Sequence, residues 1–222
     1  MQLKSAFQAL AALTAARRDF SISGHAVGVE SMASAFDFVA EWRGPLRPIE
    51  FPLPKPMLPS ATVSFLHYAG VPAAFEITTD ECIRFEFLTT AINLVHVWED
   101  GMRDWSFPVG WGRLWRIGDI SFTQANPWMC IEELTGRVVA VDVDIDDPVY
   151  LVNTSVERMM RCMKIVRDWV RSTGGLMTCA AILQDALARD PALPAGEAQH
   201  FWQPLFADAI DAGCDKVVVE LE

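Results

Sequence analysis

Three strand-like segments follow one another between residues 128 and 152, and no stretch between them is long enough for a helix. They are Trp128 to Leu134, Arg137 to Ile145 and Val149 to Val152. Thr135-Gly136 lies between the first two and suits a tight hairpin turn. Because parallel strands need a long crossover connection, strands this close in sequence pair antiparallel. This region therefore predicts an antiparallel sheet.

Apolar residues at helical spacing follow this region. Thr154 and Glu157 form a capping-box pair at the start of a helix that extends to about Val170. Further helices are expected at residues 178–188 and 197–212, the latter disturbed by Pro204. The C-terminal part of the chain is thus predicted to be helical.

Helices are also expected before the strands. Leu3, Phe7, Leu10 and Leu13 share one stripe of an N-terminal amphipathic helix. Residues 31–42 form a second helix, in which Phe36, Val39 and Ala40 are expected to face inward, and Pro59-Ser60 begins a short one that Gly70 ends. Helices at both ends with consecutive strands between them indicate the α+β class, with a mostly antiparallel sheet flanked by N- and C-terminal helices.

Two segments before residue 128 have a different character. Apolar and polar residues alternate from Cys82 to Phe87, and a β-rich run follows from Ile92 to Val97, so both are predicted strands. Residues 98–115 carry four tryptophans among glycines and Pro108, which favours a long loop leading into a strand.

Six of the thirteen prolines fall between residues 45 and 59. Proline lacks a backbone donor and has a fixed φ, so this segment holds no regular element and is an ordered crossing strap or a linker. We expect one domain over residues 1–222, with a helical N-terminal part at 1–44 and this Pro-rich connecting segment at 45–59.

The net charge of −11 disfavours binding to nucleic acid or to an anionic membrane and favours a cationic partner, although acidity is also a common route to solubility. The five cysteines form an odd set without a CxxC pair, which is typical of reduced, intracellular thiols. No apolar run approaches the ~20 residues that span a bilayer. We therefore expect a cytoplasmic protein.

The most suggestive binding tract runs from Val141 to Asp147. On a strand the carboxylates of Asp142, Asp144 and Asp146 would share one face, opposite the apolar residues, and Asp147 follows directly; all four are candidate contacts. An EF-hand loop starting at Asp142 would need Gly and Glu where the chain has Asp147 and Asn153, which argues against calcium. The tract is then a solvated strand face or a contact for a basic partner. Trp105 is a second candidate contact, because Trp concentrates binding energy at interfaces.

The sequence offers no catalytic residue. None of the four histidines lies in a recognisable nucleophile motif, and the chain has no G-x-S-x-G elbow, P-loop or G-x-G-x-x-G. Cys130 lies in a predicted strand beside Met129 and Ile131, so we expect a buried structural thiol. No metal site and no cofactor are predicted.

The order of these segments resembles the SUKH superfamily, above all its fourth subfamily of bacterial immunity proteins. The resemblance covers most of the chain and rests on these stretches: LPSATVSFLHYAGVP (Leu58 to Pro72), WMCIEELTGRVVAVD (Trp128 to Asp142), VYLVNTSVERMM (Val149 to Met160) and Phe201-Trp202. These are structural signatures, and residues 98–122 match nothing in the family. The resemblance implies a SUKH-like fold with a curled sheet.

The resemblance also implies a cytoplasmic antidote that binds a cognate protein toxin, of the nuclease or deaminase class, and occludes its active surface. The acidic charge fits such a partner, since nucleases are generally cationic around the phosphate path. Two alternatives remain open. One is a regulatory or scaffolding module that binds another protein or a small ligand, and the other is a hydrolytic enzyme.

Overall fold

The computed structural model describes residues 26–53, 55–78, 82–101, 108, 110–121, 126–143, 149–173, 184–185, 188–190, 201–202 and 218–221. Its elements are, in chain order, α2 (Ala26–Trp42), α3 (Ser60–Tyr68), β1 (Ala74–Thr78), β2 (Cys82–Asn93), α4 (Leu94–Gly101), the 3-10 turn η1 (Trp111–Arg113), β3 (Leu114–Ser121), β4 (Trp128–Glu132), β5 (Val138–Val141), β6 (Val149–Asn153), α5 (Val156–Thr173) and β7 (Val218–Leu221). The expected helix at residues 3–13 and most of those at 178–188 and 197–212 lie outside the described residues.

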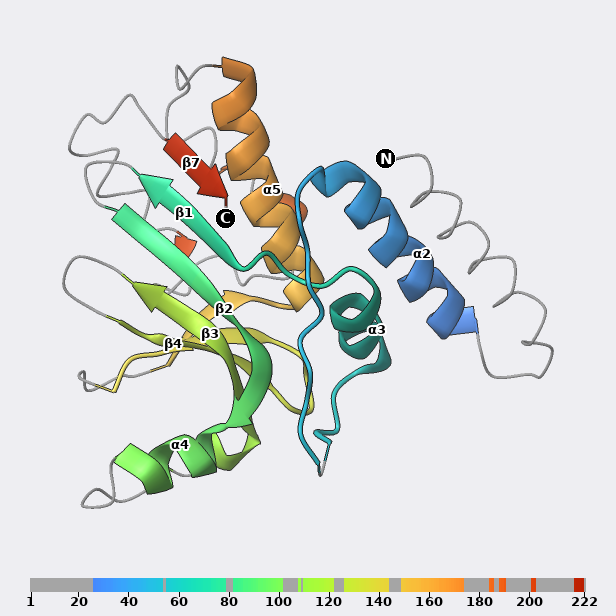
Figure 1. The fold of residues 1–222 in the computed structure, drawn as a ribbon. Coiled ribbons are helices and arrows are strands. Elements are labelled where there is room, and N and C mark those ends of the chain that lie inside the picture. Colours follow the sequence, from blue (N-terminus) through green and yellow to red (C-terminus); the bar gives the residue numbers. More distant parts are fainter. Residues whose placement is uncertain are drawn as a thin grey trace.

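The strands form one curled sheet in the order β6-β5-β4-β3-β2-β1-β7, and every neighbouring pair is antiparallel (Figure 1). The chain therefore meanders through β1 to β6, and β7 from the C-terminus adds to the free edge of β1. The expected α+β class with an antiparallel sheet is confirmed. Strands β1 and β7 were not predicted.

The predicted turn between β4 and β5 is confirmed at Gly136. This residue has φ 73°, which side chains rarely adopt, and its N–H donates to the Glu132 carbonyl oxygen at 2.9 Å. A Cβ at this position would lie 2.6 Å from Thr62 Oγ1. The turn is thus also packed against α3, and glycine serves both purposes.

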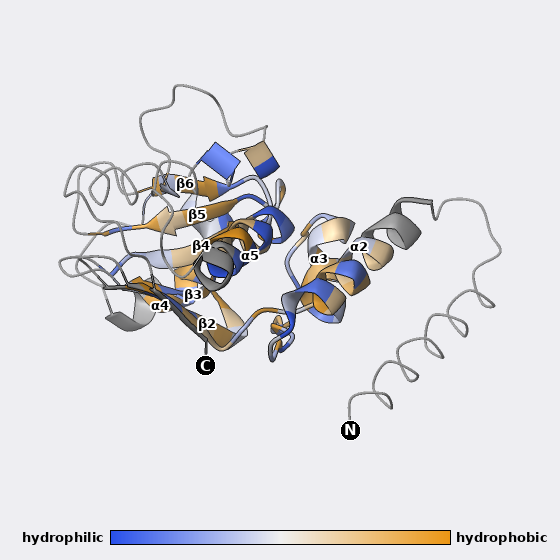
Figure 2. Ribbon diagram, turned by 90° about the horizontal axis from the view of Figure 1, so that it is seen from above, coloured by the Kyte–Doolittle hydropathy of each residue, from blue (hydrophilic) through white to orange (hydrophobic). Residues whose placement is uncertain are grey.

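The main core lies between the sheet and α5. The buried side of α5 presents Met159, Met160, Met163 and Val166, as its helical spacing predicts, and Phe85 of β2 stacks on Trp202 at 5.9 Å between ring centroids. Figure 2 shows α5 along one face of the sheet, with α2 and α3 side by side beyond it. Burial of these apolar surfaces supplies most of the stabilisation.

The inward face of α2 differs from the prediction. Ala35, Phe38 and Trp42 are buried, whereas Val39 and Ala40 are exposed and Phe36 is half-buried. The buried residues follow the i, i+3, i+7 spacing of a helix face. The choice between two apolar stripes on this helix depends on α3 and α5, which the local sequence does not reveal.

The start of α5 also differs from the predicted capping box. The Ser155 hydroxyl accepts the Arg158 N–H at 3.2 Å and so caps the helix, one residue after the predicted position. The Thr154 hydroxyl instead donates to Asp190 at 2.6 Å. Thr154 is unavailable to the helix because this carboxylate, distant in sequence, binds it.

The predicted strand from Ile92 to Val97 is wrong beyond Asn93. The structure continues β2 to Asn93 and then forms α4. Asn93 Oδ1 accepts the Val95 N–H at 3.0 Å, which satisfies a donor of the first helical turn. Leu94 and Val97 pack with Trp111 on the second face of the sheet, so the side chains that suggested a strand cover it as a helix. The predicted loop at 98–115 accordingly contains the end of α4, η1 and the start of β3.

Candidate functional site

The Pro-rich segment crosses the end of the sheet as a strap that backbone hydrogen bonds fix at two points. Arg47 exchanges two hydrogen bonds with Val71, each 2.8 Å long. Further along, the Glu50 N–H donates to the Thr89 carbonyl oxygen at 2.9 Å, and the Ala91 N–H donates to the Glu50 carbonyl oxygen at 2.8 Å. These bonds compensate for the hydrogen bonds that the prolines cannot make.

Side chains alternate along the strap as they do along a strand. Ile49 is buried, and Phe51 packs edge-on against Trp115 of β3 with ring centroids 5.9 Å apart. Glu50, between them, is exposed. The alternation turns one side of the strap to the core and the other toward solvent.

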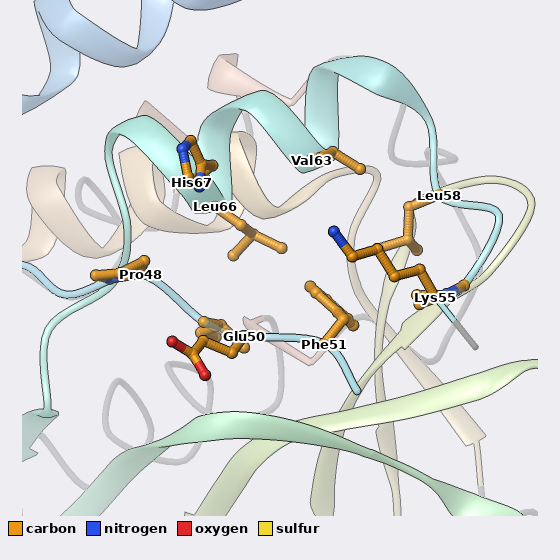
Figure 3. Close-up of a pocket in the computed structure, with 10 residues that line it drawn as sticks. Pro48, Glu50, Phe51, Lys55, Leu58, Val63, Leu66 and His67 are labelled. Carbon is orange, nitrogen blue, oxygen red and sulfur yellow. The ribbon is translucent and has the colours of Figure 1, made fainter. Parts of the chain in front are cut away.

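A cavity of about 380 Å³ lies between the strap and α3 (Figure 3). Its lining is mostly apolar and consists of Pro48, Ile49, Glu50, Phe51, Lys55, Pro56, Leu58, Val63, Leu66 and His67. Leu66 and Ile49 are only 1% and 5% exposed, so both belong to the packed core. The inner wall of the cavity is therefore part of the hydrophobic core.

Three polar side chains border this cavity. In Figure 3 the Lys55 amino group points between the strap and α3, and the Glu50 carboxylate lies toward the opposite end, below Pro48. Within the described part of the chain, neither group forms a hydrogen bond or an ion pair. His67 lies edge-on to Tyr68 at 4.8 Å between ring centroids. The cavity thus has an apolar body with a carboxylate and an ammonium group at its border.

Exposed apolar side chains lie on the strap and on α3, close in the chain to residues that line the cavity. Leu53 and Met57 of the strap are 84% and 72% exposed, and Val63 of α3 is 47% exposed. The strap is held here by Glu133, whose Oε1 accepts the Met57 N–H at 2.8 Å. We call the group formed by Glu50, Leu53, Lys55, Met57, Val63 and His67 the strap surface.

The structure places only one of the predicted contact residues. Asp142 is half-buried and directly follows β5, whereas Asp144, Asp146, Asp147 and Trp105 lie outside the described residues. Since β5 ends at Val141, the predicted strand from Arg137 to Ile145 is too long. Asp142 lies just beyond the end of β5 and Val143 lies in a turn, so neither residue is part of a strand.

The register places Asp142 at the end of the sheet where other carboxylates occur. Val141 pairs with Trp128, which pairs with Asp119, which pairs with Glu86. Arginines neutralise much of this charge. Arg116 donates to both Asp119 oxygens, at 2.9 and 2.7 Å, and lies 5.5 Å from the centre of the Trp128 ring.

Arg84 occupies the same face of the sheet and pairs with Glu86 at 2.7 Å and with Glu76 at 3.3 Å. Exposed pairs of this kind contribute little to stability. Because of these pairs, the carboxylates of Glu76, Glu86 and Asp119 are partly neutralised by arginines.

Cys130 and Cys162 are buried thiols, as predicted for Cys130. Cys130 is fully buried in β4, and burial raises its pKa far above the ordinary value. Burial also raises the pKa of Cys162 to about 12, although the hydrogen bond from Asn153 opposes the shift. A nucleophile must be a thiolate, so neither residue is suited to attack a substrate. The residues described by the structure contain no group of three or more His, Cys, Asp or Glu arranged to hold a metal ion.

Sequence reasoning treated residues 45–59 only as a connection and missed the strap surface. A local signal was present, because Ile49 and Phe51 alternate with Glu50 in a segment whose prolines enforce an extended backbone. The cavity itself depends on α3 lying opposite the strap, which this signal does not contain.

The fold and the strap surface define an α+β protein with an apolar cavity, in which the thiols of Cys130 and Cys162 are buried. A model of the SUKH-4 immunity protein family matches residues 35–208, and the chain belongs to this family. The matched range contains the strap, both sides of the cavity, β1 to β6 and α5. No curated protein and no solved structure matches the chain. None of the helices in the described ranges is both long and apolar enough to span a lipid bilayer.

Proposed function

We propose that this chain neutralises a cognate toxin by binding the toxin's active surface, without catalysing a reaction. Membership of the SUKH-4 immunity family over residues 35–208 is the observation that carries the proposal. The exposed apolar side chains of the strap surface support it, because such groups beside a cavity mark protein interaction sites.

We further propose that the toxin is basic, of the nuclease or deaminase class, and that the encounter takes place in the cytoplasm. The net charge of −11 would accelerate capture of a cationic domain through long-range attraction. Asp142, Asp144, Asp146, Asp147 and Trp105 remain proposed contacts for this partner. Residues 1–222 are proposed to act as one domain, in which the strap connects residues 1–44 to the sheet.

The product of the gene adjacent to the coding sequence is the toxin candidate to be tested. We expect the purified chain to bind the toxin domain of that gene product with a 1:1 stoichiometry in calorimetry and to protect cells in which the domain is expressed. Salt should slow association, because screening weakens the attraction between exposed charges. A chain that neither binds nor protects would exclude the antidote function and favour a regulatory or scaffolding module.

A further inference from the structure

We propose that the cavity between the strap and α3 is the anchor pocket for the toxin: it takes one apolar side chain of the partner, and Glu50 binds a lysine or arginine beside that side chain. The inference rests on the proposed function and assigns it a site. The juxtaposition that carries it is an apolar cavity of about 380 Å³ bordered by the Glu50 carboxylate, which has no ion-pair partner among the described residues.

The volume and lining of the cavity can accommodate a large apolar side chain. At about 380 Å³ the cavity has room for such a side chain together with part of the segment that carries it. Interface energy is concentrated where an anchor fills a desolvated pocket. Phe51, Leu58 and Val63 supply apolar surface for such an anchor from the strap and from α3.

The pocket is formed before a partner arrives. The strap is fixed by Arg47 to Val71 and by Glu50 to the backbone of β2, and its far end is fixed by Glu133 to Met57. Binding then requires little ordering of the backbone, and ordering is a main cost of association. A preformed pocket therefore favours tight capture.

The surroundings of the cavity favour a protein over a small molecule. Leu53 and Met57 expose most of their apolar surface outside the cavity, where a ligand of the size of the cavity would leave them in water. A protein surface that inserts an anchor would cover these two side chains as well. Contacts of this kind around an anchor add little energy themselves but exclude water from it.

The charged side chains at the border of the cavity determine which partner residue can lie beside the anchor. The Glu50 carboxylate has no partner within the described residues, so a cation would gain an ion pair there without breaking one. Lys55 repels a second cation at its side of the cavity. The two charges thus fix the direction in which the partner segment lies across the pocket.

Substitutions at exposed positions test the pocket without disturbing the core. Val63→Glu places a carboxylate at the mouth of the cavity, and Val39→Glu on α2 is the matched control, since the two valines are 47% and 40% exposed and Val39 does not line the cavity. Glu50→Lys reverses the proposed cation site. Asp37→Lys, at an exposed position of α2, changes the net charge by the same amount.

The measurement is the Kd for the toxin domain encoded by the neighbouring gene, with circular dichroism to verify that each variant is folded. We expect Val63→Glu and Glu50→Lys to raise the Kd about tenfold or more, as loss of an anchor contact does, and the two controls to stay within about twofold of the wild type. Hydrogen exchange of the wild-type complex should show protection of residues 57–67, which keeps the inference testable if a variant fails to fold.

The outcomes separate the inference from the proposed function. If the wild type binds and all four variants bind equally well, or all four weaken equally, the anchor pocket is excluded while the antidote function stands. Absence of protection at residues 57–67 in the complex excludes it as well. If the purified chain carries a small molecule in this cavity and still binds the toxin with the same Kd, the cavity is a site for that ligand and the anchor pocket is excluded. Failure of the wild type to bind excludes both proposals.

Discussion

Arg167 of α5 lies over the indole ring of Trp42, with 4.1 Å between the guanidinium carbon and the ring centroid, and donates a hydrogen bond to the Trp42 carbonyl oxygen. Trp42 is the last residue of α2, so the guanidinium satisfies a carbonyl at a helix C-terminus, where the helix dipole also favours a cation. The arginine is almost fully buried. One side chain therefore connects α2 to α5, the helix that covers the sheet.

Replacing this arginine should destabilise the protein strongly. Arg167→Met removes the stacking and leaves a buried carbonyl oxygen without a donor, and together these effects cost about 3 kcal/mol in the free energy of unfolding. Arg167→Lys should recover only part of this, because an ammonium group lacks the planar surface. Urea denaturation measures the effect, and Arg113→Ala at an exposed position is the control. A loss below about 1 kcal/mol for Arg167→Met would contradict the linking role.

A second link holds the described part of the C-terminal segment against the end of the sheet. The Asp190 carboxylate accepts the Asn153 side-chain N–H at 3.1 Å, the Thr154 N–H at 2.8 Å and the Thr154 hydroxyl at 2.6 Å. Asn153 Oδ1 in turn accepts the Trp202 indole N–H at 2.9 Å. Three donors meet one buried carboxylate, and the network extends to Trp202 in the core.

Asp190→Asn tests this network with almost no change in shape. An amide can keep its oxygen toward the two N–H donors and turn its NH₂ group toward the Thr154 hydroxyl, which then accepts, so what is lost is the negative charge that strengthens all three hydrogen bonds, and we expect a loss of about 1 to 2 kcal/mol. Asp37→Asn, on the exposed side of α2, should change stability by less than about 0.5 kcal/mol. The comparison is made by thermal and urea unfolding. Equal stability of the two variants would show that the network is not needed.

Gly70 is required because it closes α3 directly beneath the strap. It has φ 76°, and its N–H donates to the Phe65 carbonyl oxygen at 3.0 Å. A Cβ at this position would lie 2.3 Å from the Arg47 carbonyl oxygen, which belongs to the strap backbone and is bound to Val71. Neither the helix end nor the strap can move away without losing these hydrogen bonds.

Gly70→Ala should therefore cost about 3 kcal/mol or more, from both backbone strain and the steric clash. Gly110→Ala separates the two causes, because Gly110 has φ 92° but no atom within 4 Å of an added Cβ. We expect about 1 kcal/mol for this control. The free energies of unfolding are compared by urea denaturation. Similar losses for the two variants would mean that the contact with the strap contributes nothing.

The sequence predicts the β4–β5 hairpin and α5 well because their signals are local. A glycine in the left-handed region marks the turn at Gly136, and methionine and valine at helical spacing mark the buried face of α5. The helix α3 is equally local, between Pro59 and Gly70. These elements fixed the fold class and supported the resemblance to the SUKH superfamily.

The features that sequence reasoning missed depend on contacts between distant residues. Strand β7 forms because it pairs with β1. Val219 pairs with Ile77, so the partners are about 140 residues apart in the sequence. Leu94 and Val97 lie in a helix because they cover the second face of the sheet, and Thr154 binds Asp190 instead of capping α5. The cavity is of the same kind, since its two walls come from the strap and from α3.

Asp168 on α5 gives the protein a pH-dependent contribution to stability. Burial alone would raise the pKa of this carboxyl group, but the hydrogen bonds and positive charges of Lys164 and Arg167 outweigh burial and hold the pKa below the ordinary value. The Lys164 amino group also lies 3.8 Å from Glu41 of α2. A carboxyl group with a pKa lower in the folded than in the unfolded state stabilises the fold above its unfolded pKa, and the contribution disappears as the pH falls through the folded pKa.

Asp168→Asn should consequently lower the free energy of unfolding near pH 7 by about 0.5 kcal/mol, a modest amount because the side chain is 43% exposed and solvent screens the pair. The difference from the wild type should shrink once the pH falls below about 4, where the unfolded-state carboxyl group is protonated. Urea unfolding of the wild type and the variant near pH 7 and again below about pH 4 measures this difference. The control is the same substitution in a Lys164→Met background. In that background the effect should be smaller, because one of the two cations that lower the pKa is gone. A difference that stays constant from neutral to acid pH would mean that Asp168 acts through its shape and not through its charge.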